Sequence, residues 1–473
     1  MKQKYKMLFS DTIAFTISSF ASKILVFLLI PLYTSVLSTE QYGIADLITN
    51  TVNVIYPIMT LSIMEATLRF AFDEKSNSTD VLSNSLFVII FAEFIIVILW
   101  PFSSVFGKTM HEYWIWFAII FGGFNLQEVL AQYTKGMNKT KVFALSGVIQ
   151  TLVIIISNIV GLLIFKGGLS AYLLSIVLGY CLSSVYLISA AKIKLEKFTV
   201  NWKLLKEMLQ FSIPTIPVLV AWWINTSADK YIIIAFKGIA ESGIYSVAYK
   251  IPSILAMVTS IFTSAWTISA IKSVGEEDND EYQSNIYKFF NVANILACSI
   301  LILFSKIISS ILFADTFFYA WHYVPILLVA YLFSGLSGFM ASSFRAAKYT
   351  KGLFSSTVIG ALINIISNFY FVKKYGSMGA AFTTMIGFAV MFYIRSKSIQ
   401  KIVKLQINIV KDSLMYILLL VQAIAVSFEV PYGWIIALIV FIILMIINYK
   451  YVIGVLQLFL SIFKVIKKKK KRG

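Results

Sequence analysis

Charged residues inside otherwise apolar segments are the part of this sequence best suited to chemistry. Ionisable groups are costly to bury at membrane depth, so they usually face a polar cavity or a partner along a transport path. Basic groups of this kind could bind an anionic substrate. The carboxylates of Glu93 and Glu128 could bind a coupling ion or simply be buried in the protonated form. The full set is Lys23, Asp46, Glu65, Arg69, Glu93, Glu128, Asp229, Lys230, Lys250, Lys306 and Arg345.

Spacing suggests two pairs within this set. Glu65 precedes Arg69 by four residues, which is the favourable order for an ion pair on one face of a helix. Asp229 and Lys250 each lie about seven residues from the same side of the membrane, hence about 10 Å deep, and could pair across two helices or line a cavity. Lys306 is close enough to the end of its segment for its ammonium group to reach the interface.

No enzyme motif accompanies these charges. The sequence has no GxxxxGK[ST] phosphate loop, no HExxH metal motif and no GxSxG nucleophile motif. Asp278 and Asp280 have the DxD spacing of some glycosyltransferases, but they lie in an acidic polar run that is typical of a solvated loop. The two cysteines fall inside apolar segments and predict no disulfide. We therefore expect no enzymatic activity, no bound metal and no cofactor.

The elements that must position the charges are membrane-spanning helices. Of the 473 residues, 59% are hydrophobic and only 13% are charged, which places the chain in a bilayer. Because a spanning helix needs about 20 mostly apolar residues, the sequence predicts an all-α polytopic membrane protein with about 14 transmembrane helices. The expected spans are Asp11–Leu37, Tyr42–Arg69, Val81–Phe106, Tyr113–Lys135, Phe143–Phe165, Leu169–Ala191, Phe211–Phe236, Gly243–Ile271, Ile286–Phe313, Trp321–Arg345, Leu353–Val372, Met378–Arg395, Ile409–Phe428 and Trp434–Tyr451.

The basic residues predict the topology of these spans. If the N-terminus is cytoplasmic, most of the 40 lysines and arginines fall in cytoplasmic segments, as the positive-inside rule requires. Both termini are then cytoplasmic, and the net charge of +18 does not indicate nucleic acid. The basic run Lys467–Arg472 is expected to contact anionic lipids. The basic residues in the outer loops are Lys108, Lys166, Lys237, Lys373 and Lys374.

An internal repeat relates the two halves of the chain. At a fixed offset of 210 residues, segments 138–158 and 348–368 are identical at ten of 21 positions without a gap. Both segments end in the letters IISN. Nearer the start of each half, Gly43 and the isoleucine after it correspond loosely to Gly243 and the isoleucine after it. The chain therefore consists of two copies of one unit and a tail.

The repeat predicts the domain organisation. We expect an N-terminal six-helix lobe in residues 1–200 and a C-terminal six-helix lobe in residues 201–404. Two additional transmembrane helices and a basic cytoplasmic tail follow in residues 405–473. Pro214 and Pro217 remove two amide donors at the start of the seventh span. Such an interruption suits a helix that bends during alternating access.

One stretch of the sequence carries a family resemblance. Residues 209–252 read LQFSIPTIPVLVAWWINTSADKYIIIAFKGIAESGIYSVAYKIP. This stretch resembles the Wzx-like oligosaccharide flippases, polysaccharide transporters of the multidrug/oligosaccharidyl-lipid/polysaccharide (MOP) exporter superfamily. That family has a proline-rich start to its seventh span, then Asn-x-x-x-Asp-Arg, then Gly-x-Tyr-Ser-x-Ala-x-Lys. Lys230 departs from the pattern, because the family usually has arginine there. The matching residues are Asn225, Asp229, Gly243, Tyr245, Ser246, Ala248 and Lys250.

The resemblance implies a V-shaped pair of six-helix lobes around a central cavity. Such a protein moves an undecaprenyl-pyrophosphate-linked oligosaccharide, an O-antigen, capsule or exopolysaccharide precursor, from the cytoplasmic to the outer leaflet of the bacterial cytoplasmic (inner) membrane. A polysaccharide polymerase is an expected partner. The expected cavity residues are Lys23, Arg69, Asn225, Asp229, Lys230, Lys250 and Arg345. The residues expected to couple transport to H⁺ or Na⁺ are Glu93, Glu128 and Asp229.

Three other functions stay open at this point. An ion-coupled multidrug antiporter of the same superfamily would need buried acids, rather than lysines, to dominate the cavity. A membrane-embedded polysaccharide polymerase or O-acyltransferase would need long external loops or a buried catalytic histidine, and the sequence offers neither. A scaffold for a polysaccharide assembly complex would tolerate charge substitutions inside the spans.

Overall fold

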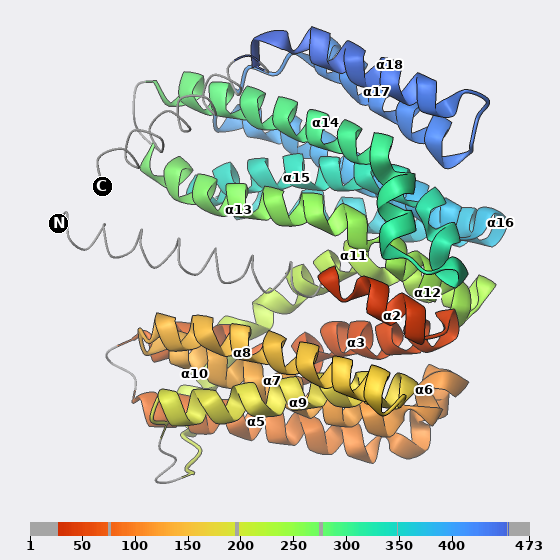
Figure 1. Ribbon diagram of the computed structural model, residues 1–473. Coiled ribbons are helices and arrows are strands. Elements are labelled where there is room, and N and C mark those ends of the chain that lie inside the picture. The colour runs from red at the N-terminus through yellow and green to blue at the C-terminus, as the bar shows by residue number, and fades with distance from the viewer. Residues whose placement is uncertain are drawn as a thin grey trace, which may run out of the picture. The chain divides into compact units, whose positions relative to one another are not determined.

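The structure is all-helical and divides into two compact units. It is a computed structural model that describes residues 27–73, 77–193, 198–273, 278–347, 349–451 and 453. These residues form helices joined by short loops and contain no strand, which confirms the expected all-α class (Figure 1). The lobe boundaries expected from the repeat stay a prediction. Unit 1 comprises Met1–Val247 and Leu312–Phe317, and unit 2 comprises Ala248–Ile311 and Phe318–Gly473.

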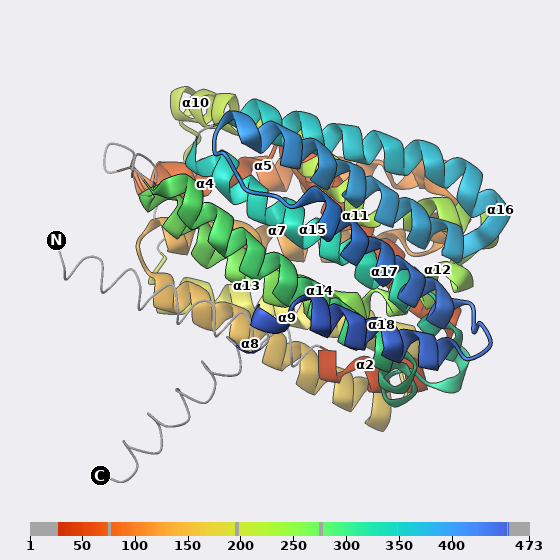
Figure 2. The same ribbon diagram turned by 90° about the horizontal axis from the view of Figure 1, so that it is seen from above.

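Unit 1 is organised around α7, which packs against α3, α4, α5, α8 and α9. The start of α3 is fixed by a capping box: the Ser38 hydroxyl accepts from the Gln41 amide, and the Gln41 side chain accepts from the Ser38 amide. The helices are α2 (Ile30–Val36), α3 (Thr39–Met59), α4 (Ile63–Ala71), α5 (Ser78–Ile98), α6 (Lys108–Glu112), α7 (Trp114–Gly136), α8 (Thr140–Asn158), α9 (Gly168–Ala190), α10 (Trp202–Ser212), α11 (Ile216–Lys237) and α12 (Ile239–Ala248) (Figures 1 and 2).

Unit 2 is organised around α15, whose side chains are mostly buried and which packs against α13, α16 and α17. The long helix α16 is kinked at Gly376, whose φ of 60° and ψ of −142° are not helical. Only glycine adopts this conformation readily. The helices are α13 (Lys250–Lys272), α14 (Asn279–Leu312), α15 (Val324–Ala346), α16 (Thr350–Ser398), α17 (Ile409–Ser427) and α18 (Gly433–Ile447).

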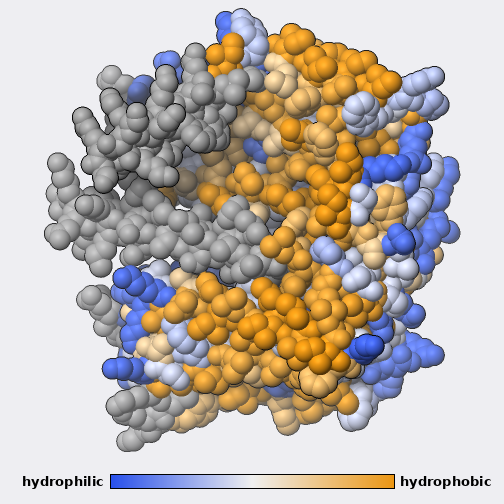
Figure 3. Space-filling model, viewed as in Figure 1, coloured by the Kyte–Doolittle hydropathy of each residue, from blue (hydrophilic) through white to orange (hydrophobic). Residues whose placement is uncertain are grey.

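The described helices make this a multi-pass membrane protein. Ten of them are long and apolar enough to cross a membrane, or eleven if α3 and α4, which meet at a 65° bend, form one broken span. The kink at Gly376 lies between the two expected spans 353–372 and 378–395. In the face shown in Figure 3, hydrophobic residues cover the sides of the helices and hydrophilic residues gather toward their ends. The first expected span, 11–37, lies mostly outside the described residues, so the total of 14 stays a prediction.

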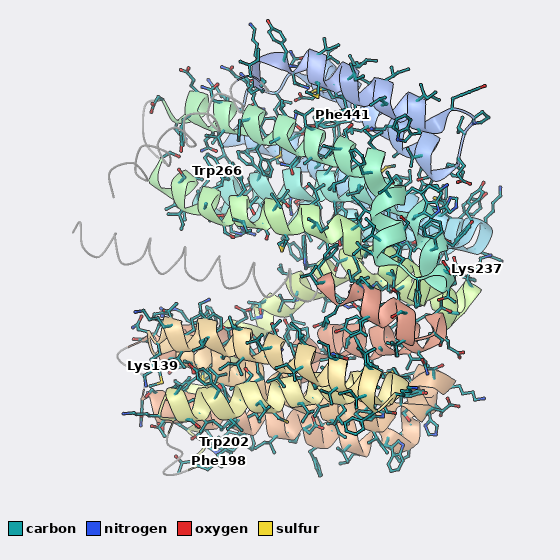
Figure 4. All side chains as sticks on the ribbon, in the orientation of Figure 1. Lys139, Phe198, Trp202, Lys237, Trp266 and Phe441 are labelled. Carbon is teal, nitrogen blue, oxygen red and sulfur yellow. The ribbon has the colours of Figure 1, made fainter. Side chains whose placement is uncertain are left out.

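Residues of unit 1 that were expected on the same side of the membrane lie at the same end of the unit. Lys139, Phe198 and Trp202, from loops expected to be cytoplasmic, lie at one end of the unit, and Lys237, expected on the outer side, lies at the other end (Figure 4). The interruption at Pro214 is also present, because a short 3₁₀ turn over Ile213–Thr215 separates α10 from α11. Which end is cytoplasmic stays a prediction.

Candidate functional site

The structure brings charged residues together where α3 and α11 of unit 1 meet. The ammonium group of Lys230 on α11 donates hydrogen bonds to both carboxylate oxygens of Asp46 on α3, at 2.9 Å to Oδ2 and 3.1 Å to Oδ1. The side chains of Lys230 and Asp46 are only 11% and 14% exposed. Each charge is balanced by the other in a place where either alone would be costly.

Side chains of α12 complete this polar network. The Ser246 hydroxyl donates to Oδ2 of Asp46 at 2.7 Å. The Tyr245 hydroxyl donates to Oδ2 of Asp229 at 2.9 Å, and Oδ1 of Asp229 accepts from the backbone amide of Lys230 at 2.9 Å. Asp229 and Tyr245 are almost fully buried. Asp229 is therefore oriented by α12, while Asp46 pairs with the ammonium group of Lys230.

Two glycines allow α3 and α12 to cross closely. A Cβ atom at Gly43 would lie 2.3 Å from the carbonyl oxygen of Ile239, and a Cβ atom at Gly243 would lie 2.0 Å from the carbonyl oxygen of Thr39. Backbone oxygens cannot move aside as side chains can, so neither position accepts a side chain without separating the helices. In each contact a glycine of one helix meets a carbonyl oxygen near the start of the other helix. Thr39 and Ile239 are 200 residues apart, and so are Gly43 and Gly243, so the two contacts are equivalent. The crossing therefore follows the internal repeat.

The family motif has a structural explanation in this crossing. The same offset of 200 relates Asp46 to Ser246, whose side chains share a hydrogen bond. Gly243 permits the close approach, Tyr245 orients Asp229, and Ser246 binds Asp46. Asp46 was not among the expected cavity residues. The charge of Asp46 inside an apolar segment and the loose correspondence of Gly43 with Gly243 were the signals that pointed to this place.

The other expected cavity residues are more dispersed. Asn225 is buried, and its Nδ2 donates to the Ala221 carbonyl one turn earlier on α11. Lys250 starts α13 in unit 2 and is half-buried, and Arg345 is exposed near the end of α15. Lys23 lies outside the described residues. The expected pairing of Asp229 with Lys250 joins residues of the two units and stays a prediction.

Arg69 is exposed in the last turn of α4, and Glu65 is exposed one turn earlier. The described residues contain no ion pair within 4.0 Å between these two side chains, although their spacing is favourable for one. A solvated pair of this kind contributes little, because holding two long side chains in one geometry costs entropy. The role of Arg69 in a substrate cavity stays a prediction.

The two carboxylates expected to couple to an ion lie on α5 and α7 of unit 1. Oε1 of Glu128 accepts a hydrogen bond from Nε2 of Gln132 at 2.5 Å, and Glu128 lines a cavity of about 210 Å³. Glu93 packs against Gly122, where an added Cβ atom would lie 2.9 Å from Oε2 of Glu93. Within the described ranges, neither carboxylate forms an ion pair shorter than 4.0 Å.

Arg395 of unit 2 is a buried charge that the sequence analysis missed. It is 3% exposed, and its guanidinium donates to Oγ of Ser356 at 2.9 Å, to the carbonyl of Ser337 at 2.8 Å and to Oγ1 of Thr357 at 2.8 Å. These bonds hold the second half of α16 to its first half and to α15. Because Arg395 ends an apolar run, its sequence context is the same as that of an exposed basic residue at a span end.

Lys306 lies near the end of α14 in unit 2. Its ammonium group donates to Oε1 of Glu429, in the loop after α17, at 2.6 Å and stands 4.6 Å from the centroid of the Trp321 ring. The side chains of Lys306 and Glu429 are both about half exposed, at 55% and 53%. The ammonium group therefore reaches the end of its span, as the sequence indicated, and there it ties the loop to α14.

Comparison with known proteins agrees with this fold. The sequence model of the family described as polysaccharide biosynthesis protein matches residues 8–268. No curated protein matches the chain. Among solved structures, the lipid II flippase MurJ in an inward closed conformation has a TM-score of 0.72 at 19% identity, over 93% of this chain and 100% of that chain.

Two MOP-superfamily transporters have the same fold at lower similarity. An inward-facing multidrug resistance MATE family transporter has a TM-score of 0.62 at 14% identity, over 80% of this chain and 99% of that chain. A transporter from Pyrococcus furiosus, described as having a binding pocket of reversed polarity, has a TM-score of 0.57 at 13% identity, over 82% of this chain and 94% of that chain. The chain belongs to the family described as polysaccharide biosynthesis protein, whose sequence model matches more than half of it, and it shares its fold with these solved transporters.

Proposed function

We propose that this protein is a flippase that moves a polyprenyl-pyrophosphate-linked oligosaccharide from the cytoplasmic to the outer leaflet of the bacterial cytoplasmic membrane by alternating access. Membership of the polysaccharide biosynthesis family supports a substrate that carries a glycan. The fold shared with a lipid II flippase supports a substrate that carries a lipid. The observation that carries the proposal is the buried pair of Lys230 and Asp46, which places a cation inside a membrane-spanning helix beside an acid.

The pyrophosphate of such a substrate could make that exchange. Removing one partner from a buried ion pair usually costs about 3–5 kcal/mol, because it leaves an uncompensated charge. A phosphate oxygen that replaces Asp46 beside Lys230 would keep the ammonium group paired, since it also accepts charge-assisted hydrogen bonds. Asp46 would then keep the hydrogen bond from Ser246. Arg69 and Arg345 are exposed and Lys250 is half-buried, and these three cations would add to the positive charge that attracts a pyrophosphate. Asp229 and Asn225 would shape the wall beside Lys230.

The driving force and the partners belong to the same proposal. Glu93, Glu128 and Asp229 are the candidates for coupling transport to H⁺ or Na⁺. A polysaccharide polymerase that consumes the translocated glycolipid would also pull the reaction forward. The basic tail, expected to bind anionic lipids, lies outside the described residues.

The test measures which leaflet holds the lipid-linked oligosaccharide. In cells that lack this protein, glycan should be protected from an external glycosidase, and wild-type protein should restore its accessibility. Lys230→Ala and Lys250→Ala should fail to restore it while still reaching the membrane. Lys237→Ala is the matched control, because Lys237 is a lysine of the same helix as Lys230 but is exposed at its end (Figure 4).

Two outcomes would contradict the proposal. Normal accessibility of the glycan in cells without the protein would show that it moves another solute. An ion-coupled multidrug antiporter, which the MATE-like fold allows, would then be tested by efflux of cationic dyes. Wild-type glycan accessibility in both the Lys230→Ala and Lys250→Ala strains would show that these lysines do not bind the substrate.

A further inference from the structure

The two halves of the chain differ in charge at one pair of equivalent turns. In unit 2, α16 turns at Gly376, between the expected spans 353–372 and 378–395. In unit 1, the equivalent turn joins α8 to α9 and begins with a π-helical turn over Ile159–Ile164. Gly167 and Gly376 are 209 residues apart, one fewer than the offset of the repeat segments that precede them. Both turns are expected on the outer side of the membrane.

The turn in unit 2 does not need charged residues in order to form. A Cβ atom at Gly379 would lie 2.3 Å from the carbonyl oxygen of Phe371, so the two arms of the turn pack closely through their backbones. Val372 is completely buried between them. The next two residues, Lys373 and Lys374, are exposed. We call them the lysine pair.

The equivalent positions in unit 1 are apolar. An offset of 209 aligns the lysine pair with Ile164 and Phe165, and an offset of 210 aligns it with Leu163 and Ile164. Ile164 and Phe165 are 68% and 75% exposed, as expected of side chains at the end of a span that contact lipid. The turn of unit 1 therefore reaches the depth of the lipid–water interface. At the same depth in unit 2, the flexible lysine side chains place their ammonium groups among lipid phosphates.

The charge of the lysine pair is not balanced within the turn. Among the residues that the structure describes, neither lysine forms an ion pair within 4.0 Å. Basic residues are rare in loops on the outer side of a membrane protein. Only five are expected in the outer loops of this chain, and two of the five are adjacent here. An unbalanced double charge at this place favours an anionic ligand.

Tyrosines lie beside the lysine pair. Tyr370 precedes Lys373 and Lys374 by three and four residues, which puts the three side chains on one face of α16. Nζ of Lys374 stands 5.1 Å from the centroid of the Tyr375 ring. Tyr370 and Tyr375 are 64% and 52% exposed. Tyrosine rings settle at the membrane–water interface, and their hydroxyls donate hydrogen bonds.

We propose that this turn binds the pyrophosphate group of a polyprenyl lipid in the outer leaflet. The lysine pair supplies charge-assisted hydrogen bonds to the phosphate oxygens, and Tyr370 and Tyr375 supply hydroxyl donors. A pyrophosphate carries negative charge on both of its phosphates and balances both lysines, whereas the headgroup of phosphatidylglycerol has a single phosphate. The turn receives the lipid-linked substrate after translocation, and this role rests on the proposed flippase function. Binding itself does not depend on it.

The experiment places a photoreactive side chain at the turn. The variant Tyr375→p-benzoylphenylalanine keeps an aromatic ring at an exposed position. The purified full chain is incorporated in phosphatidylcholine nanodiscs that contain radiolabelled polyprenyl pyrophosphate. Irradiation should couple the labelled lipid to the protein. The matched control, Phe165→p-benzoylphenylalanine, has the same photoreactive group in the equivalent turn of unit 1 and should couple at least about tenfold less, because the lysine pair is absent there.

Lysine variants test the source of the binding. In the Tyr375→p-benzoylphenylalanine background, Lys373→Ala together with Lys374→Ala should lower the coupling at least about tenfold, since each basic residue near a charged headgroup contributes about fivefold. Lys166→Ala removes the lysine of the unit 1 turn and should leave the coupling unchanged. Equal coupling with and without the lysine pair would overturn the proposal. So would loss of coupling when phosphatidylglycerol is added in the same amount as the probe, which would show that the turn binds anionic headgroups in general.

The leaflet assay distinguishes this proposal from the proposed function. Specific coupling at the turn of a protein that does not change the glycan distribution would refute the flippase and leave the lipid site intact. Restored glycan accessibility by a protein whose turn does not couple to polyprenyl pyrophosphate would refute the lipid site and leave the flippase intact.

Discussion

The crossing of α3 and α12 makes the sharpest prediction about this structure. In Gly243→Ala, the new Cβ atom would lie 2.0 Å from the carbonyl oxygen of Thr39 and 3.0 Å from the amide nitrogen of Gly43. An ordinary contact needs 3.4 Å or more, so the helices must separate by about 1.4 Å at this point. Both obstructing atoms belong to the backbone, and no rotamer change relieves the clash.

The separation has two energetic consequences. Overpacking of this kind typically costs about 1–3 kcal/mol. The 2.7 Å hydrogen bond from Ser246 to Asp46, one turn further along the same crossing, would also be stretched, and a bond to a charged group contributes about 1.5–3 kcal/mol. The expected loss is about 3–5 kcal/mol. At about 2–4 °C per kcal/mol for a domain of this size, the unfolding temperature should fall by on the order of 10 °C.

Thermal unfolding of the purified protein checks this prediction. Gly147→Ala is the matched control, because Gly147 lies in α8 and an added Cβ atom there meets no atom within 4 Å. Alanine at that position should be neutral or should stabilise by about 0.5–1 kcal/mol. Gly43→Ala should resemble Gly243→Ala, because the two contacts are related by the repeat. Equal stability of Gly243→Ala and Gly147→Ala would refute the close crossing.

Two further predictions concern unit 2. Arg395→Lys should destabilise the protein by about 2–3 kcal/mol, because one ammonium group cannot reach the three acceptors of the guanidinium; Arg345→Lys, at an exposed position, should leave the unfolding temperature unchanged. The hydrogen bond and charge of Lys306 lower the pKa of Glu429. The contribution of this pair to the free energy of unfolding is fully present above the usual glutamate pKa. It is lost as the pH falls through the lowered pKa of Glu429. Glu429→Gln should therefore unfold slightly below the wild type at pH 7, and a difference that persists at a pH well below the lowered pKa would contradict the assignment.

Several features of the fold follow from local sequence properties. Apolar length predicts the spans, and the described helices agree with it because each helix satisfies its own backbone hydrogen bonds in lipid. The proline pair predicts the interruption before α11, because proline lacks an amide donor. The break after α3 was harder to place. The expected span Tyr42–Arg69 was continuous, whereas the turn that breaks it is formed by Leu61 and Ser62, whose left-handed conformation depends on neighbouring helices.

Part of the candidate site could also be predicted from the sequence, and part of it could not. The residue types of the motif from Asn225 to Lys250, and the family resemblance that they carry, could be recognised in the sequence. The geometry of the motif could not be predicted, because the acid that pairs with Lys230 is 184 residues away in the sequence. Arg395 carries no signal at all in the sequence, since the same apolar context precedes exposed arginines.

The sequence by itself determined that this is an all-α membrane protein with an internal repeat and with charges inside its spans, because span length, repeat identity and burial cost are properties of single segments. Only the tertiary structure decided which charges meet. It paired Lys230 with Asp46, left Glu128 facing a cavity and buried Arg395 among neutral groups. The physical reason is that ion pairs and cavities depend on distances between segments far apart in the chain, and backbone packing sets those distances, here through contacts as specific as Gly43 against α12.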